Sequence, residues 1–150
     1  MKIPERLETK RLILRQYTKE DINDFLKSYK VAEPGFSLVI SSKLNDTYLG
    51  TCGLNPIKDS RNVSCVYALL PEFRHNGFAI EALLKLLEYA FIELELSKII
   101  TYIIPNNTDG WKVAERVGMK YMGQIQHNSS IQKVMLFIIE KEDYILQRSY

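Results

Sequence analysis

The sequence predicts a mixed α/β fold, in which a mostly antiparallel sheet of about six to seven strands carries helices on both faces. Three observations predict it. Short β-rich runs separated by turn residues fill residues 36–70. The best amphipathic helix of the chain, over 76–94, follows them, and a β-branched run at 98–104 follows that helix. A strand–helix–strand unit is thus set among antiparallel strands, which is typical of a mixed sheet.

The first half of the chain begins with a strand and a helix. An apolar run at 12–14 follows a polar lead and predicts the strand. Residues 18–21 (Thr-Lys-Glu-Asp) fit a capping box that opens a helix, which Pro34-Gly35 would end. Strands are then expected at 36–42, 48–57 and 63–70, and the turns between them predict an antiparallel meander.

The second half alternates helices and strands. The helix over 76–94 shows one apolar stripe with a period of 3.6 residues, and the run at 98–104 is typical of a strand buried on both faces. Asn107 or Thr108 is expected to cap a second helix, which Gly118 would close. Runs at 119–126 and 131–138 predict a final hairpin, and 140–150 a last short helix.

Composition narrows the function classes. The 150 residues suit one domain over 1–150, and 20 Lys plus Arg against 18 Asp plus Glu give no case for nucleic acid or an anionic membrane as partner. No apolar run is long enough for a membrane span, and the N-terminus lacks a signal-peptide core, so a cytoplasmic location is expected. Cys52 and Cys65 are expected as free buried thiols, and two distant histidines give no zinc-ligand spacing.

The stretch from Leu69 to Ala79 is the candidate for chemistry. A strand runs into a loop with one glycine, and the loop opens the long helix. The first turn of a helix offers unpaired N–H groups and a partial positive charge, and Gly77 lacks the Cβ that would hold a phosphate off the backbone. Arg74 adds a cation. The loop is therefore a candidate phosphate site, with an ordinary strand–helix turn as the alternative.

Arg74-x-x-Gly77-x-Ala79 resembles the pyrophosphate-binding signature of the GNAT acetyltransferase superfamily. Three further segments resemble its ribosomal-protein N-acetyltransferase branch in the right order: 8–15, 49–54, and Pro105 to Thr108 with 115–121. The resemblance covers nearly the whole chain. It implies a GNAT fold whose sheet splays between the fourth and fifth strands.

The resemblance also implies acetyl-coenzyme A as cofactor. Pantetheine would lie in the splay and bond to the backbone at Leu69 and Leu70 like an added strand. Asn107 would steady the cofactor near its thiol end. The diphosphate would lie on the loop of Arg74, His75, Asn76, Gly77, Phe78 and Ala79.

Three departures concern catalysis. Ser64 stands where the branch often has a glutamate base, and Gly110 where it often has a hydroxyl that protonates the leaving thiolate. Only about five residues separate the first helix from Phe36, so the second helix that usually walls the acceptor cleft in the family is expected to be absent or reduced to a turn. The candidate catalytic residues are Ser64, as holder of a relaying water, and Tyr102, near the thioester. Packing is the alternative role for both.

These observations predict an N-acetyltransferase in which a neutral amine attacks the thioester directly in a ternary complex. The expected acceptor is a protein or peptide α-amine, and the missing wall predicts either an open acceptor groove or a homodimer that closes it. A different class of function stays open: a non-catalytic acyl-coenzyme A sensor or interaction module on the same fold.

Overall fold

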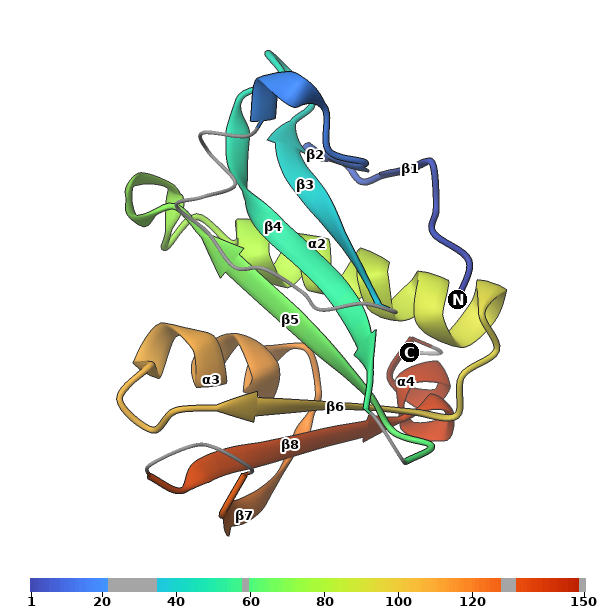
Figure 1. Ribbon diagram of the computed structural model, residues 1–150, viewed down its shortest axis with the longest axis vertical. Helices are drawn as coiled ribbons and strands as arrows, with labels where there is room; N and C mark the ends of the chain where they lie inside the picture. Colours follow the sequence, from blue (N-terminus) through green and yellow to red (C-terminus); the bar gives the residue numbers. More distant parts are fainter. Residues whose placement is uncertain (22–34, 58–59, 128–131, 149–150) are drawn as a thin grey trace.

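An open sheet of eight strands runs through the described part of the chain, in the order β1-β2-β3-β4-β5-β6-β8-β7 (Figure 1). The computed structural model describes residues 1–21, 35–57, 60–127 and 132–148. The strands are β1 Arg6–Glu8, β2 Leu12–Arg15, β3 Phe36–Ser42, β4 Tyr48–Pro56, β5 Val63–Leu69, β6 Lys98–Ile103, β7 Lys120–Ile125 and β8 Val134–Glu140. The mixed, mostly antiparallel fold class is confirmed, as are the meander β3-β4-β5 and the closing hairpin. The sheet has one strand more than expected because the short β1 pairs with β2 at its edge.

The sheet divides between β5 and β6. These two strands are parallel and pair at a single register position, Ser64 opposite Ile100, whereas β4 and β5 pair over seven positions. In Figure 1 the two strands lie together at the right and diverge to the left, where α3 (Thr108–Arg116) lies beside the opening. Because β1 was not expected, β5 and β6 are the fourth and fifth of the strands expected from the sequence, so the sheet divides where the resemblance implied.

One apolar core joins the two parts of the sheet. It packs α2 (Phe78–Glu88), α3 and α4 (Lys141–Arg148) against alternate residues of the strands. Leu38 and Cys52 contribute from one part, and Ile99 and Phe137 from the other. The three described α-helices therefore share one core. Most of the first expected helix, which was to end at Pro34-Gly35, lies outside the described residues, as does most of the region after Lys30.

The long helix begins later than expected. His75 and Gly77 have positive φ angles of 66° and 78°, which a right-handed helix does not allow, so α2 starts at Phe78 rather than at Asn76. It continues through a π-helical turn at Tyr89–Glu93, close to the predicted end. Glu81, in its first turn, accepts hydrogen bonds from the Arg11 backbone N–H at 2.8 Å and from Arg11 Nε at 2.7 Å, which ties the start of α2 to the turn before β2.

The shorter helices agree with their predicted caps. Asn107 caps α3, and Gly118 follows its end with a φ of 96°. Thr18 precedes a one-turn 3₁₀ helix, Lys19–Asp21, where Asp21 Oδ2 accepts from the Thr18 N–H at 2.7 Å as in half of a capping box. Asp21 also forms an ion pair with Arg15, whose guanidinium lowers the pKa of that carboxyl.

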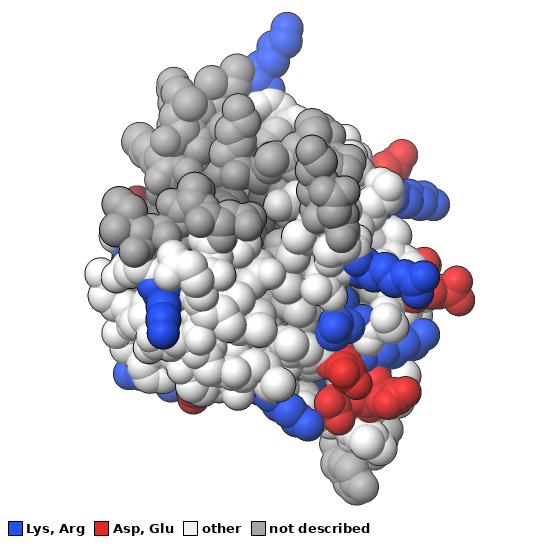
Figure 2. All heavy atoms as spheres, turned by 60° about the horizontal axis from the view of Figure 1, so that its bottom comes forward, with Lys and Arg blue, Asp and Glu red and all other residues white. Residues whose placement is uncertain are grey.

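Cys52 and Cys65 are free and buried, as expected. Burial raises the pKa of both thiols to about 12, so they stay protonated and unreactive near neutral pH. Among the described helices none is long and apolar enough to cross a membrane. On the face drawn in Figure 2, basic and acidic side chains adjoin one another along one margin, and much of the centre is uncharged.

Candidate functional site

A cavity of about 460 Å³ opens where β5 ends, between the start of α2 and the first turns of α3. Three walls form it: the end of β5, the loop that leads into α2, and the exposed side of α3. Because β6 leaves β5 beyond Ser64, this part of β5 has no neighbour on that side among the described strands. The cavity thus lies in the splay and borders the predicted phosphate loop.

The loop before α2 is sharply turned. Its two residues of positive φ, His75 and Gly77, are two positions apart, and His75 is unusual there because it carries a Cβ. Alternating left-handed residues of this kind turn successive backbone N–H groups toward one side and form an anion-binding nest. The Asn76 side chain donates to the Arg74 carbonyl at 3.0 Å and so braces the loop without lining the cavity.

The β5 wall presents Tyr67, Ala68 and Leu69 to the cavity. The Leu69 carbonyl accepts a hydrogen bond from Arg74 Nε at 3.3 Å, so Arg74 leans back over the strand end. Leu70 does not line the cavity, and its N–H donates to the Leu49 carbonyl at 2.9 Å. The strand edge open to a ligand therefore ends at Leu69.

The α3 wall begins with its cap. Asn107 Oδ1 accepts from the Gly110 N–H at 3.1 Å, and a Cβ at Gly110 would come within 2.6 Å of Asn107 Nδ2. Gly110 therefore gives its backbone N–H to the cap and brings no side chain into the cavity. Across the mouth of the cavity, Asp109 Oδ2 lies 3.6 Å from Nε2 of His75, so the two walls also meet at the surface.

Among the charged side chains of the described lining, the basic ones outnumber the acidic. Arg74, Lys112 and Arg116 line the cavity, and none of the three has an acidic partner among the residues that the structure describes. Lys112 and Arg116 are four residues apart on α3 and so lie on the same face of that helix. Asp109 is the one carboxylate among the described residues of the lining. The cavity is suited to a ligand with several negative charges.

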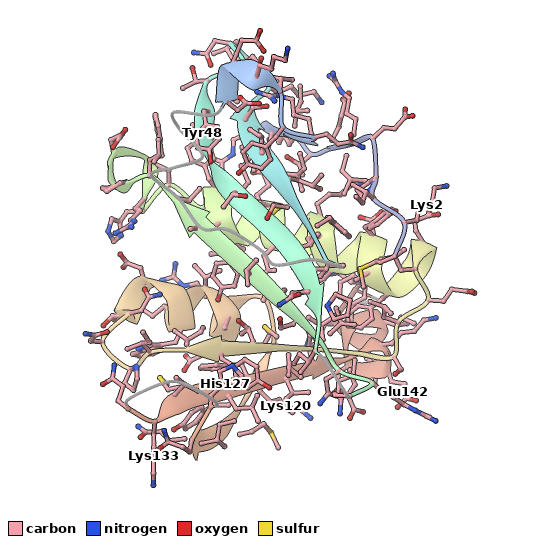
Figure 3. All side chains as sticks on the ribbon, viewed as in Figure 1. Lys2, Tyr48, Lys120, His127, Lys133 and Glu142 are labelled. Atoms are coloured by element: carbon pink, nitrogen blue, oxygen red, sulfur yellow. The ribbon has the colours of Figure 1, made fainter. Side chains whose placement is uncertain are left out.

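The two candidate catalytic residues lie elsewhere. Ser64 is buried at the paired end of β5, where its hydroxyl donates to the Asn55 carbonyl at 3.2 Å. Tyr102 on β6 stacks its ring on His127, with ring centroids 4.0 Å apart. Figure 3 places His127 near β6 and β8. Neither Ser64 nor Tyr102 lines the cavity, so their catalytic roles stay predictions.

The sequence profile of the acetyltransferase (GNAT) domain matches residues 10–120 of the chain. The chain belongs to this family. It is 29% identical over 114 residues to the Bacillus licheniformis protein named uncharacterized N-acetyltransferase p20, a match that covers 73% of this chain and 63% of p20, less than two thirds of that relative.

Solved GNAT structures share the fold. Mutant forms of the spermidine/spermine N-acetyltransferase SpeG from Vibrio cholerae superpose with a TM-score of 0.74 at 20% identity, covering 95% of this chain and 100% of SpeG. The ribosomal-protein-S5-alanine acetyltransferase from Vibrio fischeri gives a TM-score of 0.74 at 16% identity, covering 93% of this chain and 98% of that one. At these identities the likeness extends to the fold alone.

In this GNAT chain the structure brings most of the predicted cofactor residues together, but sequence reasoning missed others. The predicted residues that line the cavity are Leu69, Arg74, His75, Gly77, Phe78, Ala79 and Asn107. The lining residues that were missed are Tyr67, Ala68, Ile80, Asp109, Gly110, Lys112, Val113 and Arg116. Of these missed residues, Lys112 and Arg116 could have been found from the sequence, because two basic residues four apart on a predicted helix lie on one face of it.

Proposed function

We propose that this protein binds acetyl-coenzyme A in the cavity at the β5–β6 splay and transfers the acetyl group to an amine. The observation that carries the proposal is the cavity itself, which joins an anion nest at Gly77 to an open strand edge at Leu69. The nest and the unpaired cations suit the phosphates of the cofactor, and the open edge suits its amide-bearing pantetheine arm.

The chain's own residues would act mainly by position. The free edge of β5 would hold the thioester in line with the amine, and alignment of two reactants supplies much of the rate enhancement. A backbone N–H of β5 beyond Ser64 would polarise the thioester carbonyl. Nitrogen would form the new bond to the carbonyl carbon as the carbon–sulfur bond breaks, with the electron pair leaving on sulfur.

We infer that the acceptor is a protein or peptide α-amine. Attack requires a neutral amine, and Ser64 cannot serve as the base that would generate one from a lysine-type ammonium. A lysine amine with a pKa of about 10.4 is roughly 0.04% neutral at pH 7, and an α-amine with a pKa of about 7.8 is roughly 14% neutral. The difference is about 300-fold, or about 3.4 kcal/mol of activation free energy.

Polyamines are the competing acceptor class, because the SpeG relative in fold is a spermidine/spermine N-acetyltransferase. Their amines are nearer lysine in basicity, and Asp109 is the one carboxylate among the described lining residues. A polyamine would therefore need a general base that the described lining does not provide apart from Asp109.

The test compares acetyl transfer to three matched acceptors between about pH 6.5 and 9: a peptide with a free α-amine, the same peptide blocked there but carrying one lysine, and spermidine. We expect the α-amine peptide to react fastest near neutrality and the gap to narrow as pH rises. Equal rates for lysine near pH 7 would overturn the acceptor assignment. Tight coenzyme A binding without turnover of any amine would favour the acyl-coenzyme A sensor instead.

We also propose that the acceptor side is an open groove or is closed by a homodimer. Light scattering on the free and the coenzyme A-bound protein measures the mass. A strict monomer whose liganded structure encloses the acceptor fully would contradict both alternatives.

A further inference from the structure

Tyr67 has a position that the sequence did not reveal. Its side chain leaves β5 at the splay and reaches α3, where its hydroxyl donates a hydrogen bond of 2.7 Å to the Gly110 carbonyl. It is the described residue of β5 that lines the cavity farthest along the strand from the phosphate loop. A phenol is therefore fixed at the inner end of the cavity, between the strand and the first turn of α3.

The inner end is where the reacting sulfur belongs if the proposed function holds. With phosphates at Gly77 and the pantetheine arm extended along β5, the thioester lies at the opposite end from the loop, beside Tyr67. The leaving group of acetyl transfer is a thiolate, and a hydrogen-bond donor aimed at the sulfur stabilises the charge that develops there. Tyr67 carries the one hydroxyl among the described side chains that line the cavity.

We propose that the Tyr67 hydroxyl donates a hydrogen bond to the coenzyme A sulfur as the carbon–sulfur bond breaks. This inference rests on the proposed function. The phenol exchanges its bond to a neutral carbonyl for a stronger one to an anionic sulfur, and it can do so by rotation of the O–H alone. The attacking amine gives its extra proton to water, and the thiolate takes up one proton from water, so the phenol keeps its own.

Two features of the site support the proposed role of the Tyr67 hydroxyl as a hydrogen-bond donor. Burial raises the pKa of Tyr67 above its ordinary value, so the phenol holds its proton throughout the working range of pH. Gly110 has no side chain, so α3 supplies no hydroxyl at that position in this chain. Tyr67 on β5 instead brings its hydroxyl to Gly110, in the first turn of α3.

The first test uses the unaltered protein and its product complex. The thiol of bound coenzyme A should ionise at a lower pH than that of free coenzyme A, by about one unit or more, as measured by the ultraviolet absorbance of the thiolate. A bound thiol that ionises at the same pH as the free one, or higher, would overturn the proposal whatever a variant does.

The second test compares Tyr67→Phe with Tyr121→Phe, a matched control on the exposed edge strand β7. In Tyr67→Phe the thiol pKa of bound coenzyme A should rise by about one unit and the transfer rate at saturation should fall about tenfold. Affinity for acetyl-coenzyme A, whose sulfur is uncharged, should stay within about threefold. Loss of acetyl-coenzyme A affinity with an unshifted thiol would mark Tyr67 as a strut between β5 and α3 and would overturn the proposal. Absence of coenzyme A binding in the unaltered protein would instead overturn the proposed function.

Discussion

At the scale of single residues, backbone conformation decides the character of the site. His75 and Gly77 both take a left-handed conformation within three positions, and the α-helix cannot start until Phe78. Left-handed conformation strains a residue that has a Cβ, and such strain tends to be kept where it serves a function. The pair gives the loop beside the cavity the left-handed turns typical of an anion nest, so we expect its main chain to contribute more to anion binding than its side chains.

Replacing Gly77 with glutamate should abolish coenzyme A binding. The substitution places a Cβ at a φ of 78° and adds a negative charge where the phosphates are proposed to lie. We expect the dissociation constant to rise at least about 100-fold by calorimetry, which corresponds to about 2.7 kcal/mol.

Gly123→Glu is the matched control. Gly123 also has a positive φ, 102°, but it lies on β7 with no heavy atom within 4 Å of a built Cβ. The control should lose similar stability and keep its affinity. Unchanged affinity in folded Gly77→Glu would show that the diphosphate lies elsewhere.

At the scale of elements, α3 contributes more than a cap. Its first turn meets Tyr67 through Gly110, and its exposed side carries Lys112 and Arg116 into the cavity. Cations without acidic partners in the described structure are free to meet the phosphates of a ligand, and charge-assisted contacts are stronger than neutral ones. The helix thus forms the electrostatic wall opposite the loop.

Charge reversal at Lys112 or Arg116 should weaken coenzyme A binding about tenfold each, or about 1.4 kcal/mol. The loss should shrink at high salt because exposed charges are screened. Calorimetry at two salt concentrations measures both effects.

Lys133→Glu is the control for charge, since Lys133 is exposed and projects outward at the β8 side, away from α3, in Figure 3. Equal losses in all three variants would point to long-range attraction in place of direct contact. Full affinity in the two α3 variants would show that Lys112 and Arg116 do not contribute to coenzyme A binding.

At the scale of the whole molecule, one apolar core joins the two parts of a sheet that divides between β5 and β6. The parts on either side of the splay meet in strand pairing only at Ser64 and Ile100, yet one apolar cluster spans both. Thr101 adds a buried bond from its hydroxyl to the Cys65 carbonyl at 3.0 Å. Because this apolar core includes residues from both parts, we propose that residues 1–150 form one folding unit.

Calorimetric unfolding should therefore show one transition, with equal calorimetric and van't Hoff enthalpies. Coenzyme A at about 100 times its dissociation constant should add about 2.7 kcal/mol to the free energy of unfolding and raise the midpoint without splitting it. Two resolved transitions, of which only one responds to coenzyme A, would contradict a single unit.

Periodicity and turn chemistry predicted most elements correctly because those signals are local. The stripe of α2, the Asn107 cap, Gly118 and the closing hairpin all agree with the structure. The start of α2 was wrong by two residues, since nothing in the sequence marks His75 as left-handed. The short β1 was missed because three residues give no period to detect.

The sequence by itself determined the mixed fold and the glycine loop at the start of α2, since both rest on local patterns along the chain. The splay followed from the family resemblance that the sequence carries. Tertiary structure alone decided which side chains meet. Tyr67 and Gly110 are 43 residues apart and share a hydrogen bond, while Ser64 is turned into the strand pairing. Contacts between distant residues depend on how the core packs, and packing responds to the shapes of all its side chains together.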